Sequence, residues 1–188
     1  MLAGFIAYLV PLFLNDLGHS ESSIGRIMML YGLSAIALIR FVARLADRSG
    51  GYGFLVALGT AIAGLGCLVS IFADAVGGPT NALIIAVLAL GVGHALTLTS
   101  QNSIIQQVAV QYQNTIGVAS VIGAYRLVER IGMVIGPIIA AVLISDFGYQ
   151  YAIAAFGFLL LGLILLFVFV IVIPDWRNRS RGAATVNV

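Results

Sequence analysis

The chain contains few charged residues and no lysine. Of its 188 residues, 9% are charged, and all nine basic residues are arginine. A soluble domain usually has about a quarter of its residues charged. Because 61% of the residues are hydrophobic, the composition is that of an integral membrane protein, most of which lies in lipid. A soluble globular fold is therefore excluded.

The chain also lacks concentrated positive charge and paired cysteines. Its formal net charge is +2, whereas nucleic-acid-binding domains gather Lys and Arg on one face. Its one cysteine, Cys67, lies in an apolar run, which excludes a disulfide framework and a Cys-based metal site. An enzyme embedded in the membrane would need clustered His or carboxylates within its spans, and only His94 falls there. We therefore expect no nucleic-acid partner, no metal, no cofactor and no enzymatic activity.

Long hydrophobic runs dominate what remains. A membrane helix needs about 20 apolar residues, and the runs predict an all-α bundle of six membrane helices. The predicted spans are residues 2–14, 24–42, 53–73, 81–106, 115–144 and 149–173. They form one membrane domain over residues 1–174, followed by a cytoplasmic tail at 175–188. Because the first run begins at Leu2 without a basic leader, we expect a fragment, a truncated protein or the product of a split gene.

A short charged stretch, ARLADRSGGYG, separates the second and third spans. It contains Arg44, Asp47 and Arg48, and its glycines include Gly50. Glycine adopts positive φ at little cost, so we predict a turn from Ala43 to Gly53.

This stretch resembles the signature between the second and third helices of each half of a major facilitator superfamily transporter, roughly G-x-L-A-D-R-x-G-R-R. Five positions match: Leu45, Ala46, Asp47, Arg48 and Gly50. Ala43 stands where the first Gly is expected, and Gly51-Tyr52 replaces the basic pair. The resemblance implies the C-terminal six-helix half of a twelve-helix transporter.

A second motif lies in the fifth span. Gly132, Gly136 and Ala140 fall at i, i+4 and i+8, a small-residue stripe that lets helices approach closely in lipid. Pro137 follows Gly136 and is expected to bend the helix. The run is similar to the Gly-Pro motif of the fifth and eleventh helices in the superfamily. Two roles stay open: ordinary helix packing, or a hinge that moves during transport.

Arginine placement predicts the orientation in the membrane. The basic residues that follow the second and sixth spans are Arg44, Arg48, Arg177, Arg179 and Arg181. The turns after the first, third and fifth spans carry no arginine, and their charged residues are Asp16, Glu21, Asp74 and Asp146. Basic residues mark the cytoplasmic side; Arg26, just inside the second span, is the exception. We predict a multi-pass protein of the plasma or inner membrane with both termini cytoplasmic.

Asp47 is a candidate latch, together with Arg44, Arg48 and Gly50. A carboxylate accepts charge-assisted hydrogen bonds and is stabilised at a helix N-terminus. The resemblance implies that the helix whose N-terminus Asp47 approaches is the fifth helix of the missing half. The alternative is a solvated turn in which Asp47 pairs with Arg44 or Arg48 for about 0–1 kcal/mol.

A charge cluster opens the fifth span. Arg126, Glu129 and Arg130 lie at i, i+3 and i+4, so Glu129 can pair with Arg126 on one helix face. Two roles stay open: an ion pair at the membrane interface with extended arginine side chains, or a cytoplasmic gate. The resemblance implies that the cluster faces the charged stretch of the other half.

The fourth span carries a polar stripe. His94, Thr97 and Gln101 fall at i, i+3 and i+7. The resemblance implies that the first and fourth helices line a central cavity, so these residues, with Tyr8 and Asn15 on the first span, are candidate solute contacts. The alternative is a stripe that hydrogen-bonds to neighbouring helices. An unperturbed histidine titrates near neutral pH, so His94 is a candidate proton carrier; the alternative is a hydrogen-bonded packing residue.

Taken together, the resemblance implies secondary active transport of a small solute by alternating access, with this chain as one half of the transporter. The expected partners are a small-molecule substrate, the lipid bilayer, and a missing N-terminal half or a second copy. The alternative function is a transporter-derived sensory or scaffolding module without transport.

Overall fold

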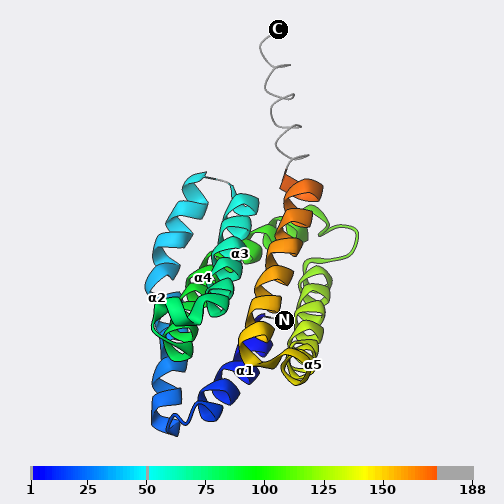
Figure 1. The fold of residues 1–188 in the computed structure, drawn as a ribbon. Coiled ribbons are helices and arrows are strands. Elements are labelled where there is room, and N and C mark those ends of the chain that lie inside the picture. The colour runs from blue at the N-terminus through cyan, green and yellow to red at the C-terminus, as the bar shows by residue number, and fades with distance from the viewer. Residues whose placement is uncertain (1, 50, 173–188) are drawn as a thin grey trace.

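The computed structural model describes residues 2–49 and 51–172, and every regular element in these ranges is helical. The elements are α1 (Leu2–Asp16), α2 (Glu21–Ser49), α3 (Tyr52–Leu68), the 3-10 helix η1 (Val69–Val76), α4 (Pro79–Gln111), α5 (Val118–Phe167) and the π-helical turn η2 (Val168–Val172). They form a bundle of helices lying beside one another (Figure 1). The predicted all-α class is confirmed for these residues.

Within the described residues, four helical stretches are long and apolar enough to cross a membrane: Glu21–Ala46, Tyr52–Val76, Pro79–Gln111 and Val118–Val170. α1 is apolar but shorter. The protein is therefore a multi-pass membrane protein by length and composition.

Helix α5 turns back on itself at Gly148. The backbone there leaves the helical region, with φ 77° and ψ 172°, a conformation that glycine adopts readily. A straight helix of 50 residues would extend about 75 Å, but Figure 1 shows two segments running side by side in opposite directions. α5 is thus two helical segments, residues 118–147 and 149–167. The predicted fifth and sixth spans left residues 145–148 as the connection between them, and in the structure its one non-helical residue is Gly148.

The prediction of a turn from Ala43 to Gly53 is wrong. Helix α2 continues through Arg44 and Arg48 to Ser49, and α3 begins at Tyr52. Ala, Leu and Arg are strong helix formers, so the helix extends beyond the apolar run that lies in lipid. Gly50 and the side chain of Asp47 lie outside the described part of the chain, and the latch stays a prediction.

Glycines set the spacing between α3 and its neighbours. A Cβ atom on Gly59 would lie 2.7 Å from the Gly93 carbonyl oxygen of α4. A Cβ on Gly157, in the second segment of α5, would lie 2.8 Å from the Gly64 carbonyl oxygen. Real Cβ atoms do not approach so closely, so both contacts require glycine. Small residues of this kind let membrane helices pack backbone against backbone.

Helix α1 packs on the second segment of α5 through aromatic side chains. The rings of Phe5 and Phe156 stack with centroids 3.7 Å apart, and those of Phe13 and Tyr149 with centroids 4.9 Å apart. Phe5, Leu9 and Phe156 belong to the larger buried cluster of the protein. This cluster joins the two ends of the described chain.

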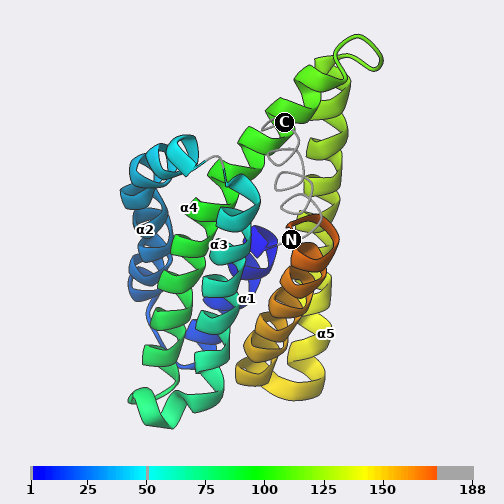
Figure 2. The ribbon, with the colours of Figure 1, turned by 90° about the horizontal axis from the view of Figure 1, so that it is seen from above.

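Hydrogen bonds join the helices at the end of the bundle where the chain reverses at Gly148. His19 Nε2 lies 2.9 Å from Thr80 Oγ1, and Ser70 Oγ donates to the Gln150 carbonyl oxygen at 2.9 Å. η1 and the Gly148 reversal lie at this end, whereas the α2–α3 and α4–α5 connections lie at the opposite end (Figure 2). The two ends of the bundle therefore carry alternate connections of the chain.

The contact at Gly59 predicts that two Gly→Ala substitutions affect the midpoint of thermal unfolding differently. Gly59→Ala should lower the midpoint of thermal unfolding in detergent, because the methyl group must push α3 from α4; overpacking costs about 1–3 kcal/mol. Gly123→Ala is the control, since a Cβ there meets nothing within 4 Å, and it should leave the midpoint unchanged or raise it. Equal midpoints for the two variants would contradict the close α3–α4 contact.

Candidate functional site

A cavity of about 320 Å3 lies between α3, α4 and both segments of α5. Much of its wall is apolar and includes Phe156, Leu160 and Leu163. Its polar side chains are Thr60, His94, Thr97, Gln101, Tyr125 and Glu129. A mostly apolar cavity with a few convergent polar groups is typical of small-molecule sites.

The polar stripe of α4 lies at this cavity. His94, Thr97 and Gln101 all belong to its lining, because positions three, four and seven apart share one face of a helix. Gly93, at the contact with α3, belongs to the same lining. The cavity therefore begins where α3 and α4 touch.

Two threonine hydroxyls face the cavity with their protons already used. Thr97 Oγ1 donates to the Gly93 carbonyl oxygen at 2.8 Å, and Thr60 Oγ1 donates to the Val56 carbonyl oxygen at 2.9 Å. A hydroxyl has one proton and two lone pairs. Both oxygens can therefore still accept a hydrogen bond from a solute.

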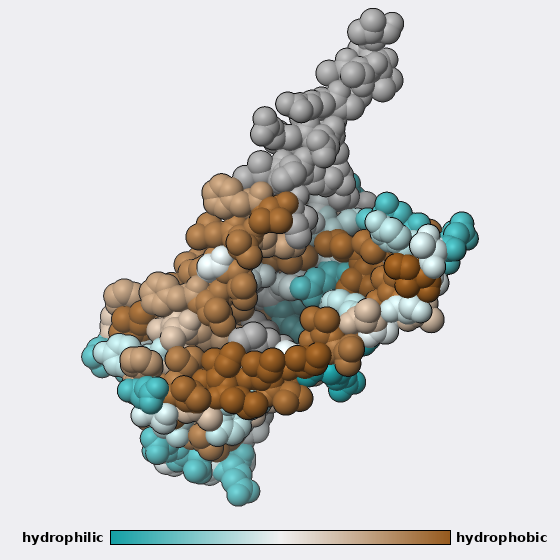
Figure 3. Space-filling view, turned by 90° about the vertical axis from the view of Figure 1, so that its right-hand side faces the viewer, coloured by the Kyte–Doolittle hydropathy of each residue, from teal (hydrophilic) through white to brown (hydrophobic). Residues whose placement is uncertain are grey.

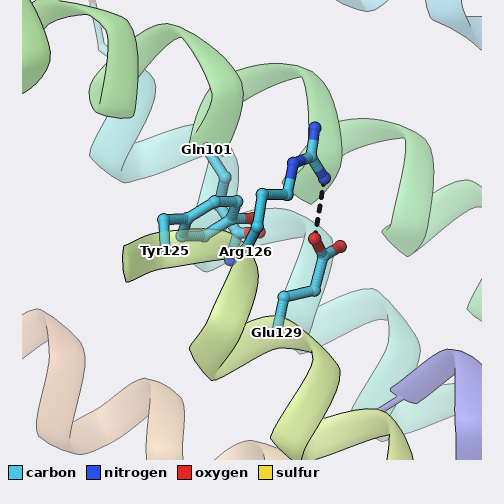
Figure 4. Close-up of polar contacts among 4 residues, drawn as sticks. All are labelled: Gln101, Tyr125, Arg126 and Glu129. Carbon is cyan, nitrogen blue, oxygen red and sulfur yellow. Dashed lines mark hydrogen bonds and ion pairs between the residues drawn. The ribbon is translucent and has the colours of Figure 1, made fainter. Parts of the chain in front are cut away.

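A polar group bridges α4 and α5 beside the cavity (Figure 4). The Tyr125 hydroxyl donates to Gln101 Oε1 at 3.3 Å. Arg126 Nη1 lies 2.7 Å from Glu129 Oε2, and Arg126 Cζ lies 5.7 Å from the centroid of the Tyr125 ring. The bridge places an aromatic face, a carboxylate and an amide oxygen within one small region.

The predicted charge cluster divides at this point. Glu129 lines the cavity, but Arg126 and Arg130 are not among its lining residues. The side chain of Arg126 is 53% exposed and that of Glu129 is 29% exposed, while Arg130 is exposed. The pairing of Glu129 with Arg126 agrees with the i, i+3 spacing, and the role across an interface between halves stays a prediction.

Tyr8 and Asn15 are exposed residues of α1 and are not among those that line the cavity. The reason is the packing of α1: Phe5 stacks on one side of Phe156, and Phe156 itself forms part of the cavity wall. α1 is thus separated from this cavity by an aromatic side chain.

His94 is held between the cavity and α2. Its ring centroid lies 5.7 Å from that of Tyr31, and the ring planes are tilted by 42°. Among the described residues, the buried Tyr31 hydroxyl and the buried Ser100 Oγ have no hydrogen-bond partner. Packing against Tyr31 restricts the His94 ring while one of its sides remains at the cavity.

The small-residue stripe of α5 lies on a packed face. Gly136 and Ala140 are buried, while Gly132 and Pro137 are half-buried. The helix continues through Pro137, and the non-helical residue within α5 is Gly148. The burial agrees with a packing role, and the hinge stays a prediction.

Sequence reasoning predicted the third helix but did not assign to the cavity its residue Thr60, nor Tyr125, nor the apolar wall from the second segment of α5. Thr60 carries a hydroxyl in an otherwise apolar part of α3, a signal that the sequence does contain. Tyr125 directly precedes the predicted charge cluster. Phe156, Leu160 and Leu163 give no signal, because they are indistinguishable in sequence from lipid-facing residues.

Figure 3 shows hydrophilic residues recessed between hydrophobic surfaces on one face of the molecule. Within residues 2–49 and 51–172, no three His, Cys, Asp or Glu side chains come together in a way that would hold a metal ion.

A family model described as Major Facilitator Superfamily matches residues 1–187. No curated protein and no solved structure matches the chain. The match covers almost the whole sequence and confirms the resemblance that the charged stretch and the Gly-Pro motif indicate. The chain therefore belongs to the major facilitator superfamily.

Proposed function

We propose that this chain moves a small solute across the membrane by alternating access, as one half of a secondary transporter. Its superfamily carries out membrane transport, and the members are transporters rather than enzymes. The observation that carries the proposal is the cavity of about 320 Å3, into which α3, α4 and α5 direct six polar side chains. Polar groups at membrane depth are costly, and substrate pathways are where they are found.

The helices support six crossings of the membrane. The reversal at Gly148 divides α5 into two antiparallel segments, residues 118–147 and 149–167. A span needs about 20 residues, a length that the first segment exceeds and the second nearly reaches. We propose that α2, α4, α3 extended by η1, and the shorter apolar helix α1 are the other four crossings, which gives six. Six crossings correspond to one half of a twelve-helix transporter.

A second half is proposed to complete the solute path. Transporters of this architecture bind the solute between two halves and rock the halves about it. The first segment of α5 has apolar side chains that are exposed in the single chain, including Leu127, Val134 and Ile138. We propose that a separate N-terminal half or a second copy, together with lipid, covers this surface.

The orientation proposal rests on the arginines. Arg44 and Arg48 are exposed at the end of α2, and basic residues mark the cytoplasmic side. We propose that the end of the bundle with the α2–α3 and α4–α5 connections is cytoplasmic, as are both termini, in a plasma or inner membrane.

Cysteine labelling of intact cells tests this orientation. Asp74→Cys and Asp146→Cys should react with a membrane-impermeant maleimide, whereas Asn114→Cys should react only after permeabilisation. All three positions are exposed. The native Cys67 is fully buried, so the unmodified chain provides the blank. Labelling of Asn114→Cys in intact cells, with protection of the other two, would reverse the proposed topology.

Uptake by reconstituted protein tests the transport function. A panel of labelled sugars, amino acids, carboxylates and organic cations is offered to proteoliposomes, and the oligomeric state is measured by light scattering. We expect saturable uptake of one solute by paired chains and none by the monomer. Thr97→Val should reduce uptake about tenfold, since one lost hydrogen bond is worth about 1.4 kcal/mol.

Thr99→Val is the matched control, because Thr99 lies on the same helix and is not among the cavity-lining residues. Saturable uptake by the monomer would defeat the requirement for a second half. The absence of saturable uptake across the panel would contradict transport and favour a sensory or scaffolding role.

A further inference from the structure

The cavity contains hydrogen-bond acceptors and negative charge, and its described lining residues include no arginine or lysine. Glu129 carries the one formal negative charge among these lining residues. Thr60 and Thr97 donate their protons to carbonyl oxygens of their own helices, so both present lone pairs to the cavity. Gln101 contributes a carbonyl oxygen beside Tyr125. These acceptor oxygens and the Glu129 carboxylate are together complementary to a positively charged or proton-donating solute.

An arginine outside the cavity lining, Arg126, already pairs with Glu129. Arg126 Nη1 lies 2.7 Å from Glu129 Oε2, and its Cζ atom lies 5.7 Å from the Tyr125 ring centroid (Figure 4). A carboxylate beside an aromatic face is a favourable environment for an organic cation. Both groups therefore lie within reach of one cation, here the guanidinium of a residue on the same helix.

The ion pair between Arg126 and Glu129 is weak. The side chain of Arg126 is 53% exposed, its partner is three residues away on the same helix, and it is not among the cavity-lining residues. Exposed ion pairs of this kind contribute little to stability. A solute cation that also fills the apolar part of the cavity would contact Phe156, Leu160 and Leu163, a gain that Arg126, outside the lining, does not have.

We propose that the cavity binds an amphipathic, monovalent organic cation, with Glu129 and the Tyr125 ring at its charged end and Arg126 as an internal competitor. The apolar part of the solute contacts the wall formed by the second segment of α5. The inference rests on the proposed function in one respect, that this cavity is the solute site.

Equilibrium dialysis of tetraphenylphosphonium against the purified full chain in detergent micelles tests the proposal. We expect saturable binding that Glu129→Gln weakens about tenfold or more and that Glu129→Asp, which keeps the charge, largely retains. Arg126→Gln should tighten binding about two- to fivefold, since the competitor is removed. Arg130→Gln removes the same charge from an exposed position that is not among the lining residues, and it should have a smaller effect.

Several results would overturn this proposal. One is equal affinity of the wild-type chain and Glu129→Gln at matched thermal stability. Another is weaker binding by Arg126→Gln, since a purely structural ion pair predicts loss from either side. A third is saturable binding of tetraphenylborate, the anion of the same shape, that disappears in Arg126→Gln.

The binding assay separates this inference from transport itself. A chain that binds the cation through Glu129 but shows no uptake supports the cation site and contradicts the proposed function. A chain that takes up a sugar or a carboxylate, without Glu129-dependent cation binding, supports transport and overturns the cation site.

Discussion

A polar group in hydrocarbon must find its partner inside the protein, because an unpaired one costs several kcal/mol. Helix formation meets this requirement for the backbone, and all described regular elements are helices. Side chains need a different solution. On α4, His94, Thr97 and Gln101 are gathered on the face that looks into the cavity, and Tyr125 of α5 donates to Gln101. His94, Thr97 and Gln101 lie on this face because polar side chains that faced the lipid would lack hydrogen-bond partners.

The place of these polar side chains depends on backbone contacts through glycine. Gly93 touches Gly59 where α3 and α4 meet, and it is also a lining residue of the cavity. Gly64 and Gly157 make a similar contact between α3 and the second segment of α5. Beyond α3, α4 and the first segment of α5 continue toward their connecting loop (Figure 2). The close contact of α4 with α3 at Gly93 and the cavity between α3, α4 and α5 therefore position the polar groups that a solute would meet.

Sequence periodicity was sufficient for part of this site. Polar residues spaced along one helix face predict which side chains lie together, and His94, Thr97 and Gln101 do line one cavity. Periodicity does not say which face a neighbouring helix covers. Tyr8 and Asn15 were expected at the cavity, but Phe156 lies between α1 and that space. The family was recognisable from the charged stretch and the Gly-Pro run, although that stretch is helical up to Ser49, because its residues favour helix more than its glycines favour a turn.

The central claim is that the cavity beside α4 is a water-accessible solute path within a membrane-embedded bundle. Its most direct test is the rate at which a water-soluble thiol reagent modifies Thr97→Cys and Thr99→Cys in lipid vesicles, each in a Cys67→Ala background. Position 97 lines the cavity, whereas position 99 on the same helix is not among the lining residues. The account predicts modification at least about tenfold faster at position 97, because only thiols in contact with water ionise readily and react. Equal rates at the two positions, or faster modification at position 99, would contradict it.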